Sequence, residues 1–404
     1  MHEARLTELA QWITGEGLAG ATEAEMMTGF CERAVAAGLP LASAVLFIDT
    51  LHPIHEGRAA RWSRATAKTE ITDYGRTNEG ESAQNWRATP FFRLVETGQK
   101  ASRHRVHDEA ETGSAFFRSR REEGLTEYIC VMNRFAAEGV IGEMDSVTSG
   151  WGTDRPEGFS DADLAALKRA LPHLALAMKC AALGRMAGAL VETYLGRGAG
   201  RLVLGGRIAR GVAERISAAL WFSDLRGFTK ITDTAPPDQI IPLLNDYADA
   251  VLSAIHDRGG DVLKLIGDGV LAIFRSEDAQ LASRAAIAAA RSAAGRIDEL
   301  NSRRDAERLP TTHMYVGLHM GEVFFGNIGS KDRLDFTVVG PAVNETSRIA
   351  AMCRSADQPL LMSADFARAL DNPRRVVSVG RFALRGVGRP QELFTLDPEA
   401  GAAE

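Results

Sequence analysis

Hydrophobic and polar positions divide the chain into two regions with different patterns. In residues 1–158, short apolar runs such as 42–51 (ASAVLFIDTL) and 128–135 (YICVMNRF) are separated by long polar intervals. Runs of this kind are typical of strands, and with the helical stretches between them they predict an α+β domain. From residue 216 to 398, strand and helix patterns alternate. This predicts an α/β domain with a mixed, mainly antiparallel sheet flanked by helices.

A helix is predicted to connect the two regions over residues 159–192. Ser160 and Asp163 have the spacing of a helix N-terminal capping box in which Asp replaces the usual Glu or Gln. A mainly apolar stripe then follows at alternating three- and four-residue steps: Leu164, Leu167, Leu171, Leu174, Met178, Ala181 and Arg185. The stripe fits a parallel coiled coil between two copies of the chain, and it equally fits packing on the N-terminal domain. Pro172 predicts a kink or a break, because proline in a helix interior costs about 3 kcal/mol.

Residues 193–215 are rich in glycine, which disfavours a continuous helix and predicts a hinge-like connector. The expected organisation is therefore an N-terminal domain (1–158), a connecting helix (159–192), a hinge-like segment (193–215) and a C-terminal domain (216–398).

Composition and charge narrow the function classes. The chain has 404 residues and a net charge of -6, which disfavours a nucleic-acid partner because such binding uses a clustered basic surface. No stretch approaches the roughly 18 uninterrupted apolar residues of a membrane span, so none is expected. The N-terminus MHEARLTELAQW lacks the basic-then-apolar layout of a secretion signal, which predicts a cytoplasmic protein. The four cysteines are scattered and indicate neither a zinc site nor a disulfide framework.

The first segment that carries candidate chemistry is SAALWFSDLRGFT (217–229). It reads as an apolar strand that ends at Asp224 and turns through Gly227 toward a helix beginning near Thr229 or after Pro237. Free backbone N–H groups at a helix start bind phosphate, and a neighbouring carboxylate can hold a metal ion. An Asp at a strand end is more often a helix cap or a turn former.

The second segment is GGDVLKLIGDGVLAIF (259–274), which predicts two strands joined by the tight turn Gly267-Asp268-Gly269. Asp-Gly is a common hairpin dipeptide, so a plain hairpin explains the turn. Lys264 stands inside an otherwise apolar strand, where its charge must find a partner, face a cleft, or lie on the solvent side of the hairpin. The pattern leaves these alternatives open.

The third segment spans residues 316–350, in which two strands lead into a helix that begins near Pro341. Asn344 and Arg348 are four residues apart and so lie on one helical face. Such a pair is commonly a solvated surface, but the planar guanidinium of arginine is also suited to bind a phosphoryl group.

Together, these three segments resemble the catalytic domain of the class III adenylate and guanylate cyclases. The matching motifs are FSDLRGFT (222–229), KLIGDGVLAIF (264–274) and RLDFTVVGPAVNETSR (333–348), in the family's order and spacing. The resemblance implies that Asp224 and Asp268 hold two Mg²⁺ or Mn²⁺ ions per active site. It also implies that Lys264 and Thr337 read an adenine base. The expected reaction is the conversion of ATP to cyclic AMP and pyrophosphate.

The resemblance assigns further roles. Asn344 is expected to position the ribose and Arg348 to stabilise charge on the reacting phosphorus. Arg333 lies where family members place a phosphate-binding arginine. The backbone at Gly227 and Phe228 is expected to contact the substrate.

Two positions depart from the family pattern, and the family's assembly adds an expectation. Arg385 stands where a phosphate-binding lysine is common, which keeps the charge but changes the reach. Pro341 replaces an acid found in many bacterial members and gives its helix a rigid start. In this family the metal-binding acids and the base-reading residues come from different protomers, so the resemblance implies a homodimer with shared sites.

The N-terminal region offers fewer signals. Its close, beginning WGTDRPEGFSDADL (151–164), resembles the end of a GAF-type domain that senses a small molecule, and no ligand can be named. His52 with His55, and His104 with His107, have spacings that a metal or haem could use, although paired surface histidines are more common.

Three alternative functions fit parts of the sequence. Gly259-Gly260-Asp261 begins like the GGDEF signature of diguanylate cyclases, but Val262 and Leu263 follow in place of Glu and Phe. A catalytically degenerate nucleotide-binding module and a guanylate cyclase are the other two.

Overall fold

The structure is a computed structural model, and it describes residues 3–78, 80–108, 114–135, 141–142, 144–370 and 376–397. The chain forms two compact units, Met1–Leu190 and Val191–Glu404.

A six-stranded sheet forms the centre of the N-terminal unit. Its order is β3-β2-β1-β6-β5-β4, and all of its neighbouring strands are antiparallel. The strands are β1 (Ser43–Asp49), β2 (Gly57–Ser63), β3 (Lys68–Tyr74), β4 (Ala101–Arg105), β5 (Glu127–Arg134) and β6 (Ser146–Thr153). Strands β1 and β5 coincide with the two apolar runs of the sequence, so the predicted α+β character of this region is confirmed.

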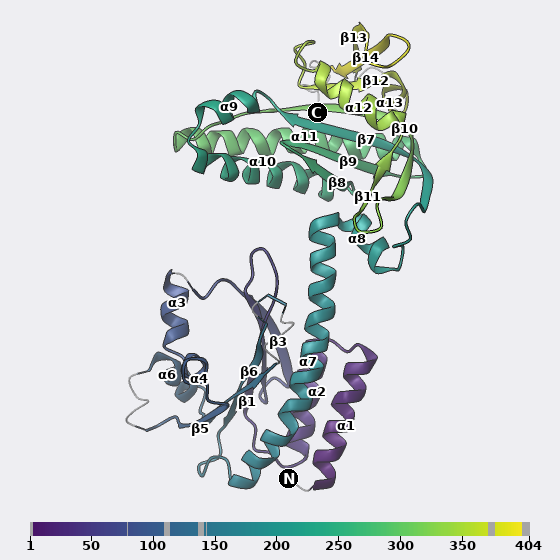
Figure 1. The fold of residues 1–404 in the computed structure, drawn as a ribbon. Coiled ribbons are helices and arrows are strands. Elements are labelled where there is room, and N and C mark those ends of the chain that lie inside the picture. Colours follow the sequence, from purple (N-terminus) through teal and green to yellow (C-terminus); the bar gives the residue numbers. More distant parts are fainter. Residues whose placement is uncertain are drawn as a thin grey trace. The chain divides into compact units, whose positions relative to one another are not determined.

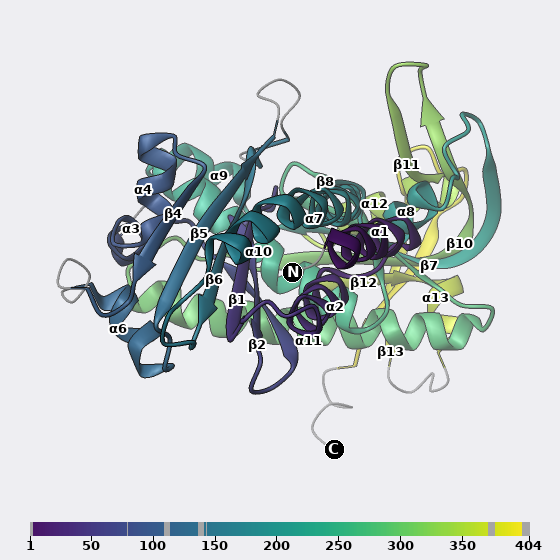
Figure 2. The ribbon, with the colours of Figure 1, turned by 90° about the horizontal axis from the view of Figure 1, so that it is seen from below.

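Helices cover both faces of this sheet, as Figures 1 and 2 show. One face carries α1 (Glu3–Ala19), α2 (Glu23–Ala36) and α7 (Asp161–Leu195), which share the larger apolar core with the sheet. The other face carries α3 (Gly80–Arg87), α4 (Pro90–Thr97) and α6 (Ala115–Glu122), over a smaller core rich in aromatic residues.

Helix α7 confirms the predicted capping box. The Ser160 N–H donates to the Asp163 carboxylate over 2.9 Å, and the Asp163 N–H donates to the Ser160 hydroxyl over 3.2 Å. Pro172 lies inside α7 without ending it, so the predicted break is absent. The stripe packs on the N-terminal core, where Leu167 and Met178 are buried. Of the two interpretations of the stripe, the structure shows packing on the N-terminal domain.

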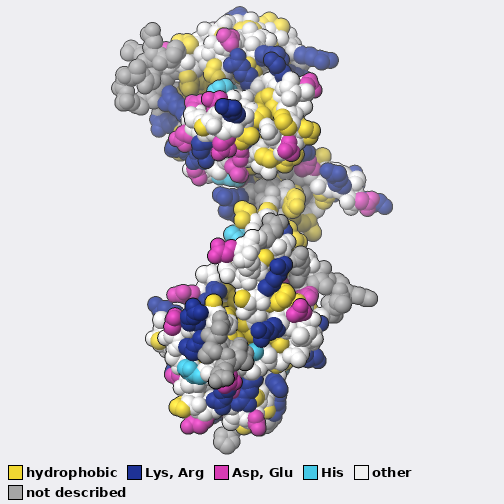
Figure 3. All heavy atoms as spheres, turned by 90° about the vertical axis from the view of Figure 1, so that its left-hand side faces the viewer, with side chains coloured by type: hydrophobic (Ala, Val, Ile, Leu, Met, Phe, Trp, Pro, Cys, Tyr) yellow, Lys and Arg dark blue, Asp and Glu magenta, His cyan; other side chains and the backbone are white. Residues whose placement is uncertain are grey.

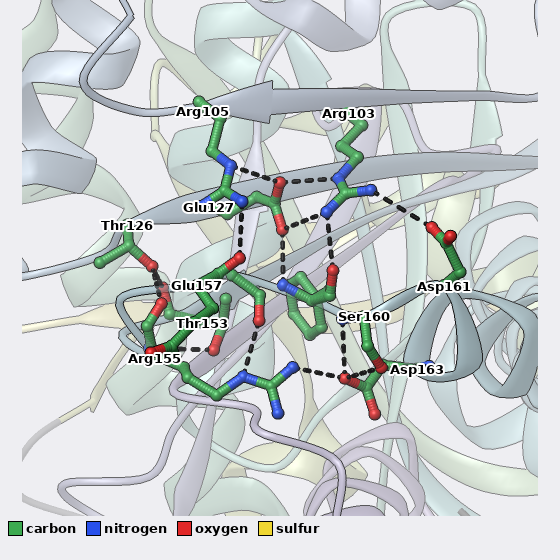
Figure 4. Close-up of polar contacts among 12 residues, drawn as sticks. Arg103, Arg105, Thr126, Glu127, Thr153, Arg155, Glu157, Ser160, Asp161 and Asp163 are labelled. Atoms are coloured by element: carbon green, nitrogen blue, oxygen red, sulfur yellow. Dashed lines mark hydrogen bonds and ion pairs between the residues drawn. The ribbon is translucent and has the colours of Figure 1, made fainter.

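A network of charged groups ties the sheet to the start of α7 (Figure 4). Glu127 on β5 is fully buried, and its carboxylate lies 2.7 Å from the Arg103 guanidinium and 3.2 Å from that of Arg105. The same carboxylate accepts the Phe159 N–H over 2.6 Å, two residues before α7 begins. Glu127 therefore holds both strand β4 and the entry to α7.

By length and composition, α7 could cross a membrane. This is weak evidence, because the core helix of a soluble protein meets the same criteria. In α7, 33% of the most apolar 18-residue stretch is buried. The expectation of no membrane span stays a prediction.

The C-terminal unit has a mixed, mainly antiparallel sheet, as predicted. Its order is β13-β14-β12-β10-β7-β9-β8, with β11 paired to β10, and the β10–β12 pair is parallel. The strands are β7 (Ala213–Leu225), β8 (Asp261–Ile266), β9 (Gly269–Arg275), β10 (Met314–Gly329), β11 (Leu334–Val339), β12 (Leu360–Ser363), β13 (Val376–Phe382) and β14 (Gln391–Leu396).

Helices pack on both faces of this second sheet. Helices α10 (Pro237–Asp257) and α11 (Ala279–Ala306) form a core with Trp221 and Phe274. On the opposite face, α8 (Arg197–Leu204) and the start of α12 (Pro341–Met352) join a second core around Leu220. The short helices α9 (Phe228–Thr234) and α13 (Ala364–Arg368) follow β7 and β12.

The glycine-rich segment 193–215 differs from the hinge-like connector predicted for it. Helix α7 continues to Leu195, α8 follows, and β7 already begins at Ala213. The glycines permit close packing: a Cβ on Gly198 would lie 2.2 Å from the carboxylate of Asp261. Glycine here allows α8 to approach the sheet.

Candidate active site

Asp224 lies near the end of β7, opposite Tyr315 of β10. The backbone just after Asp224 is hydrogen-bonded to the residues that precede β10. The Arg226 N–H donates to the His313 carbonyl over 2.8 Å, and the Thr312 hydroxyl donates to the Arg226 carbonyl over 2.6 Å. These bonds fix the backbone at the end of β7, two residues after Asp224.

Asp268 reaches the same point from the turn between β8 and β9. The turn is tight because Gly267 has a φ of 64°, in the left-handed region that favours glycine. The Asp268 carboxylate accepts the Leu225 N–H over 3.2 Å and is hydrogen-bonded to the Asp224 carboxyl. Burial, together with this bond and the negative charge of Asp268, raises the pKa of Asp224 to about 6.

This acid pair fits a divalent cation. Two carboxylates in contact are unfavourable when both are ionised, and a hard cation with oxygen ligands relieves the repulsion. Among the described residues, no group of three or more His, Cys, Asp or Glu side chains could hold a metal. Asp224 and Asp268 would hold the ion, and water and phosphate are common ligands in the other positions of a Mg²⁺ site.

Gly227 and Phe228 follow the acid pair directly. Gly227 has a φ of 71° and precedes α9, which has no side-chain cap at its N-terminus. Phe228 is half-buried and packs on the core beneath α10. The sequence expected a helix near Thr229 or after Pro237, and the structure contains both α9 and α10.

Lys264 on β8 forms an ion pair with Asp335 on β11. Both side chains are partly exposed, so Lys264 has found a partner on an open surface of the hairpin. Thr337 lies two residues beyond Asp335 and therefore on the same face of β11. Asp335 was not among the sequence-predicted residues, although its strand alternation with Thr337 is a signal that could have identified it.

Arg333 lies in the turn between β10 and β11. Its backbone closes the turn, because its N–H donates to the Ser330 hydroxyl over 3.1 Å and its carbonyl accepts the Ser330 N–H over 2.8 Å. Its side chain is exposed.

Helix α12 begins at Pro341 as predicted and carries Asn344 and Arg348 on its more open side. The helix sits close to β10 because Gly317 has no side chain: a Cβ there would lie 2.5 Å from the Ala350 nitrogen. This close approach fixes the height of α12 above the sheet.

The guanidinium of Arg348 lies against the loop between β13 and β14. A Cβ on Gly386 would be 3.5 Å from its terminal nitrogen, and Gly386 has a φ of 74°. Arg385, the neighbouring residue, is exposed. Two arginines thus gather near one loop, and Arg348 has no hydrogen-bond or ion-pair partner among the described residues.

The predicted site residues therefore form three groups within one chain. Asp224 and Asp268 are in contact, Lys264 pairs with Asp335 beside Thr337, and Arg348 lies by the Arg385 loop. Across the described ranges, no hydrogen bond or ion pair joins one group to another.

In the N-terminal unit, His52 and His104 are hydrogen-bonded to neighbouring groups of the chain. The ring of His52 accepts the N–H groups of Ile54 and His55 and stacks on the His55 ring at 4.9 Å. His104 hydrogen-bonds the Ser102 hydroxyl over 2.8 Å.

Comparison with known proteins identifies a family for the C-terminal part of the chain. Residues 213–397 match the family model "Adenylate and Guanylate cyclase catalytic domain". An adenylate cyclase of Anabaena cylindrica is 32% identical over 167 residues, which cover 40% of this chain and 32% of that protein. An uncharacterized protein of Mycobacterium tuberculosis is 33% identical over 185 residues, which cover 44% of this chain and 31% of that protein. The chain thus spans about a third of the length of these relatives.

Among solved structures, the adenylyl cyclase CyaB from P. aeruginosa matches with a TM-score of 0.43 and 23% identity, covering 46% of this chain and 96% of that chain. The family model, the order of the three motifs and the paired acids all lie in the same part of the sequence. The C-terminal part of this chain, residues 213–397, is an adenylate/guanylate cyclase catalytic domain.

Proposed function

We propose that the C-terminal domain converts ATP to 3′,5′-cyclic AMP and pyrophosphate, in a homodimer regulated by the N-terminal unit. The observation that carries this proposal is the contact between Asp224 and Asp268, with the raised pKa of Asp224. A strongly perturbed acid pair at the end of a strand is typical of a functional site. Here its position coincides with the family's metal-binding acids.

The reaction joins the ribose 3′-oxygen to the α-phosphorus and expels pyrophosphate. Two Mg²⁺ or Mn²⁺ ions, when bound, would activate the attacking oxygen and hold the leaving group. Asp224 and Asp268 supply the protein's oxygen ligands. Arg348 neutralises charge that develops on the phosphorus, and Arg385, at the loop it packs on, contacts phosphate. Asn344, one helical turn before Arg348, orients the ribose.

Three more residues bind the triphosphate. Arg333 extends from an exposed turn and adds a positive charge. The N–H groups around Gly227 and Phe228 lie next to the acid pair, where no side chain caps α9.

The preference for ATP rests on Lys264 and Thr337. Lys264 donates to a ring nitrogen of adenine, and Thr337 accepts from the exocyclic amine. The ion pair with Asp335 supports this assignment, because it places the Lys264 ammonium near the face of β11 that carries Thr337. Guanine presents the opposite donor and acceptor at these positions, so this pair disfavours GTP.

A second copy of the chain completes the site. One face of the β10–β11 hairpin carries Thr337 and also Phe324, which pairs with Val339 in register. Phe324 is 56% exposed, and Leu265 of the neighbouring hairpin is also 56% exposed. Exposed apolar side chains around a functional group are typical of an interface. A homodimer would bring the acid pair of one copy to the base-reading face of the other.

The N-terminal unit serves as a GAF-like sensor for a small molecule, in a cytoplasmic protein without a membrane span. Support comes from its separate core and from a cavity in one face of its sheet. No nucleic-acid partner is proposed, since positive and negative side chains are interspersed over the face drawn in Figure 3.

The test is a competition assay with purified full-length protein, Mn²⁺, and equal ATP and GTP, with both cyclic products measured. Cyclic AMP is expected to dominate. Preference for GTP would overturn the base-reading assignment, and no product from either nucleotide would favour a nucleotide-binding module. Asp224→Asn is expected to abolish turnover, whereas Asp249→Asn, which removes an exposed carboxylate of α10, leaves it unchanged.

The shared site has its own test. Asp224→Asn and Arg348→Ala chains are each expected to be inactive, and mixing them should restore activity at one of the two sites. Failure to regain activity in a verified mixed dimer would contradict a site built from two copies.

A further inference from the structure

The N-terminal unit contains a cavity of about 1100 Å³ between its sheet and helices α3, α4 and α6. Residues of β1, β2, β3, β5 and β6 line it on the side of the sheet, and residues of the three helices line it on the other side. Binding sites for small organic molecules are commonly concave, largely apolar and several hundred Å³ in volume. This cavity is therefore large enough to enclose such a molecule.

Aromatic rings line much of the cavity. Phe47 and Tyr74 approach it from the sheet, with ring centroids 6.2 Å apart. Phe116 of α6 and Tyr128 of β5 meet at 5.5 Å with their rings at 75°. Trp86 of α3 adds a fifth ring. Flat aromatic or heteroaromatic bodies pack well among such rings, which sets the shape of the expected ligand.

Two arginines lie within this aromatic lining. The Arg120 guanidinium is 5.2 Å from the Phe116 centroid and 5.8 Å from that of Tyr128. The Arg61 guanidinium is 5.8 Å from the Phe47 centroid. Because a cation over an aromatic ring is partly desolvated, it attracts an anion more strongly than a surface cation does.

The polar lining has donors without partners. The Nε atom of Arg120 is buried and has no hydrogen-bond partner among the described residues, although another of its nitrogens donates to Glu123 over 3.0 Å. The Ser43 hydroxyl, also in the lining, is buried and equally unpartnered in the described part of the chain. Buried donors without acceptors are unfavourable, and a ligand that brings an acceptor satisfies them.

Three acidic lining residues, by contrast, already have donors. Asp49 accepts the Tyr74 hydroxyl over 2.7 Å, and Glu56 accepts the Thr77 N–H over 2.5 Å. Asp154 is paired with Arg64. These carboxylates are engaged within the protein, whereas the buried Nε atom of Arg120 has no acceptor among the described residues.

We propose that this cavity binds a small organic anion with a flat aromatic body, whose anionic group contacts Arg120 and whose ring lies among Phe47, Phe116 and Tyr128. The proposal deepens the sensor part of the proposed function and does not depend on cyclase activity. The anionic group is a carboxylate or a phosphate, and the experiment separates the two.

The experiment is isothermal titration of the full-length protein with four probes. Indole-3-acetate and 1-naphthyl phosphate carry the two anionic groups, and indole-3-acetamide and 1-naphthol are their neutral counterparts. At least one anion is expected to bind with a micromolar Kd and at least tenfold more tightly than its neutral counterpart. No binding of either anion at millimolar concentration, or equal binding of the neutral probes, would overturn the proposal.

Variants locate the binding. Arg120→Gln is expected to weaken the anion at least tenfold while leaving the neutral probe unchanged, with folding checked by circular dichroism. Arg118→Gln removes an exposed arginine from the same helix and should not alter either affinity. Unchanged anion binding in Arg120→Gln contradicts the assignment. The same titration on Asp224→Asn separates ligand binding from catalysis, because that variant binds the probe whether or not the domain makes cyclic AMP.

Discussion

Replacing Asp224 with Asn is expected to stabilise the metal-free cyclase domain while removing its activity. The pKa of Asp224 rises from 3.8 to about 6, chiefly because burial disfavours its charged form and also because Asp268 is close. At neutral pH the folded protein keeps this carboxyl ionised in surroundings that favour protonation. The folded state therefore carries an unfavourable electrostatic free energy that a neutral side chain would not have.

The size of the effect follows from the pKa. A rise from 3.8 to about 6 corresponds to about 3 kcal/mol at 1.36 kcal/mol per tenfold change in proton affinity. Because the Asp224 carboxyl is only partly buried and still contacts solvent, screening reduces this to about 1 kcal/mol. The pKa of Asp224 is higher in the folded state than in the unfolded state, so protonation of Asp224 stabilises the folded protein. This stabilisation is fully present below pH 3.8 and is lost as the pH rises through 6. The gain from Asn therefore appears above pH 6 and fades toward pH 4.

Differential scanning calorimetry of the full chain in EDTA measures this gain. About 1 kcal/mol should raise the Tm of a domain of this size by roughly 2–4 °C at pH 7.5. Millimolar Mn²⁺ is expected to stabilise the native protein and not the variant, because only the native acid pair binds the ion. The control Asp249→Asn should alter neither result. A lower Tm of Asp224→Asn at pH 7.5, or an unchanged response to Mn²⁺, would refute the reasoning.

Four further results are expected. The apparent affinity for Mn²⁺ should fall about tenfold for each pH unit below the pKa of Asp224, about 6, and level off above pH 7, as titrations should show. Glu127→Gln should destabilise the N-terminal unit by about 2–3 kcal/mol in urea unfolding, because it leaves two arginines without their buried partner. Gly317→Ala should lower both stability and kcat by displacing α12, whereas Gly184→Ala, with open space around it, should be neutral. Asp335→Asn should raise KM for ATP about three- to tenfold with kcat within twofold, because in the proposed site Asp335 positions Lys264, which contacts the base.

Much of the fold was predictable where the signal is local. The turn at Gly267–Gly269, the helix start at Pro341 and the capping box at Ser160 depend on a few adjacent residues, and each was confirmed. For the glycine-rich segment 193–215 the sequence predicted a hinge-like connector, and the structure contains α8 within it. In α8 the missing Cβ at Gly198 instead allows close packing against Asp261.

Local sequence patterns do not determine which residues far apart in the sequence contact one another. The sequence left the partner of Lys264 undecided, and the structure supplies Asp335, 71 positions away. The stripe of α7 fits a partner helix or a domain surface equally well, and only the packed core shows which surface it meets. Composition likewise says nothing of a cavity, because its walls come from separate strands and helices.

Strand β5 shows how the cavity that we propose binds a ligand is connected to helix α7. Successive residues of a strand point to opposite faces, so Tyr128 lines the cavity while Glu127, its neighbour, binds the start of α7. A ligand that moves the Tyr128 ring acts on Glu127 through a single peptide unit. Because Glu127 is fully buried, a displacement there must change its bonds to Arg103, Arg105 or Phe159. The same helix α7 continues to Leu195, beyond the boundary of the N-terminal unit. Covalent continuity alone thus gives the cavity a route toward the cyclase domain.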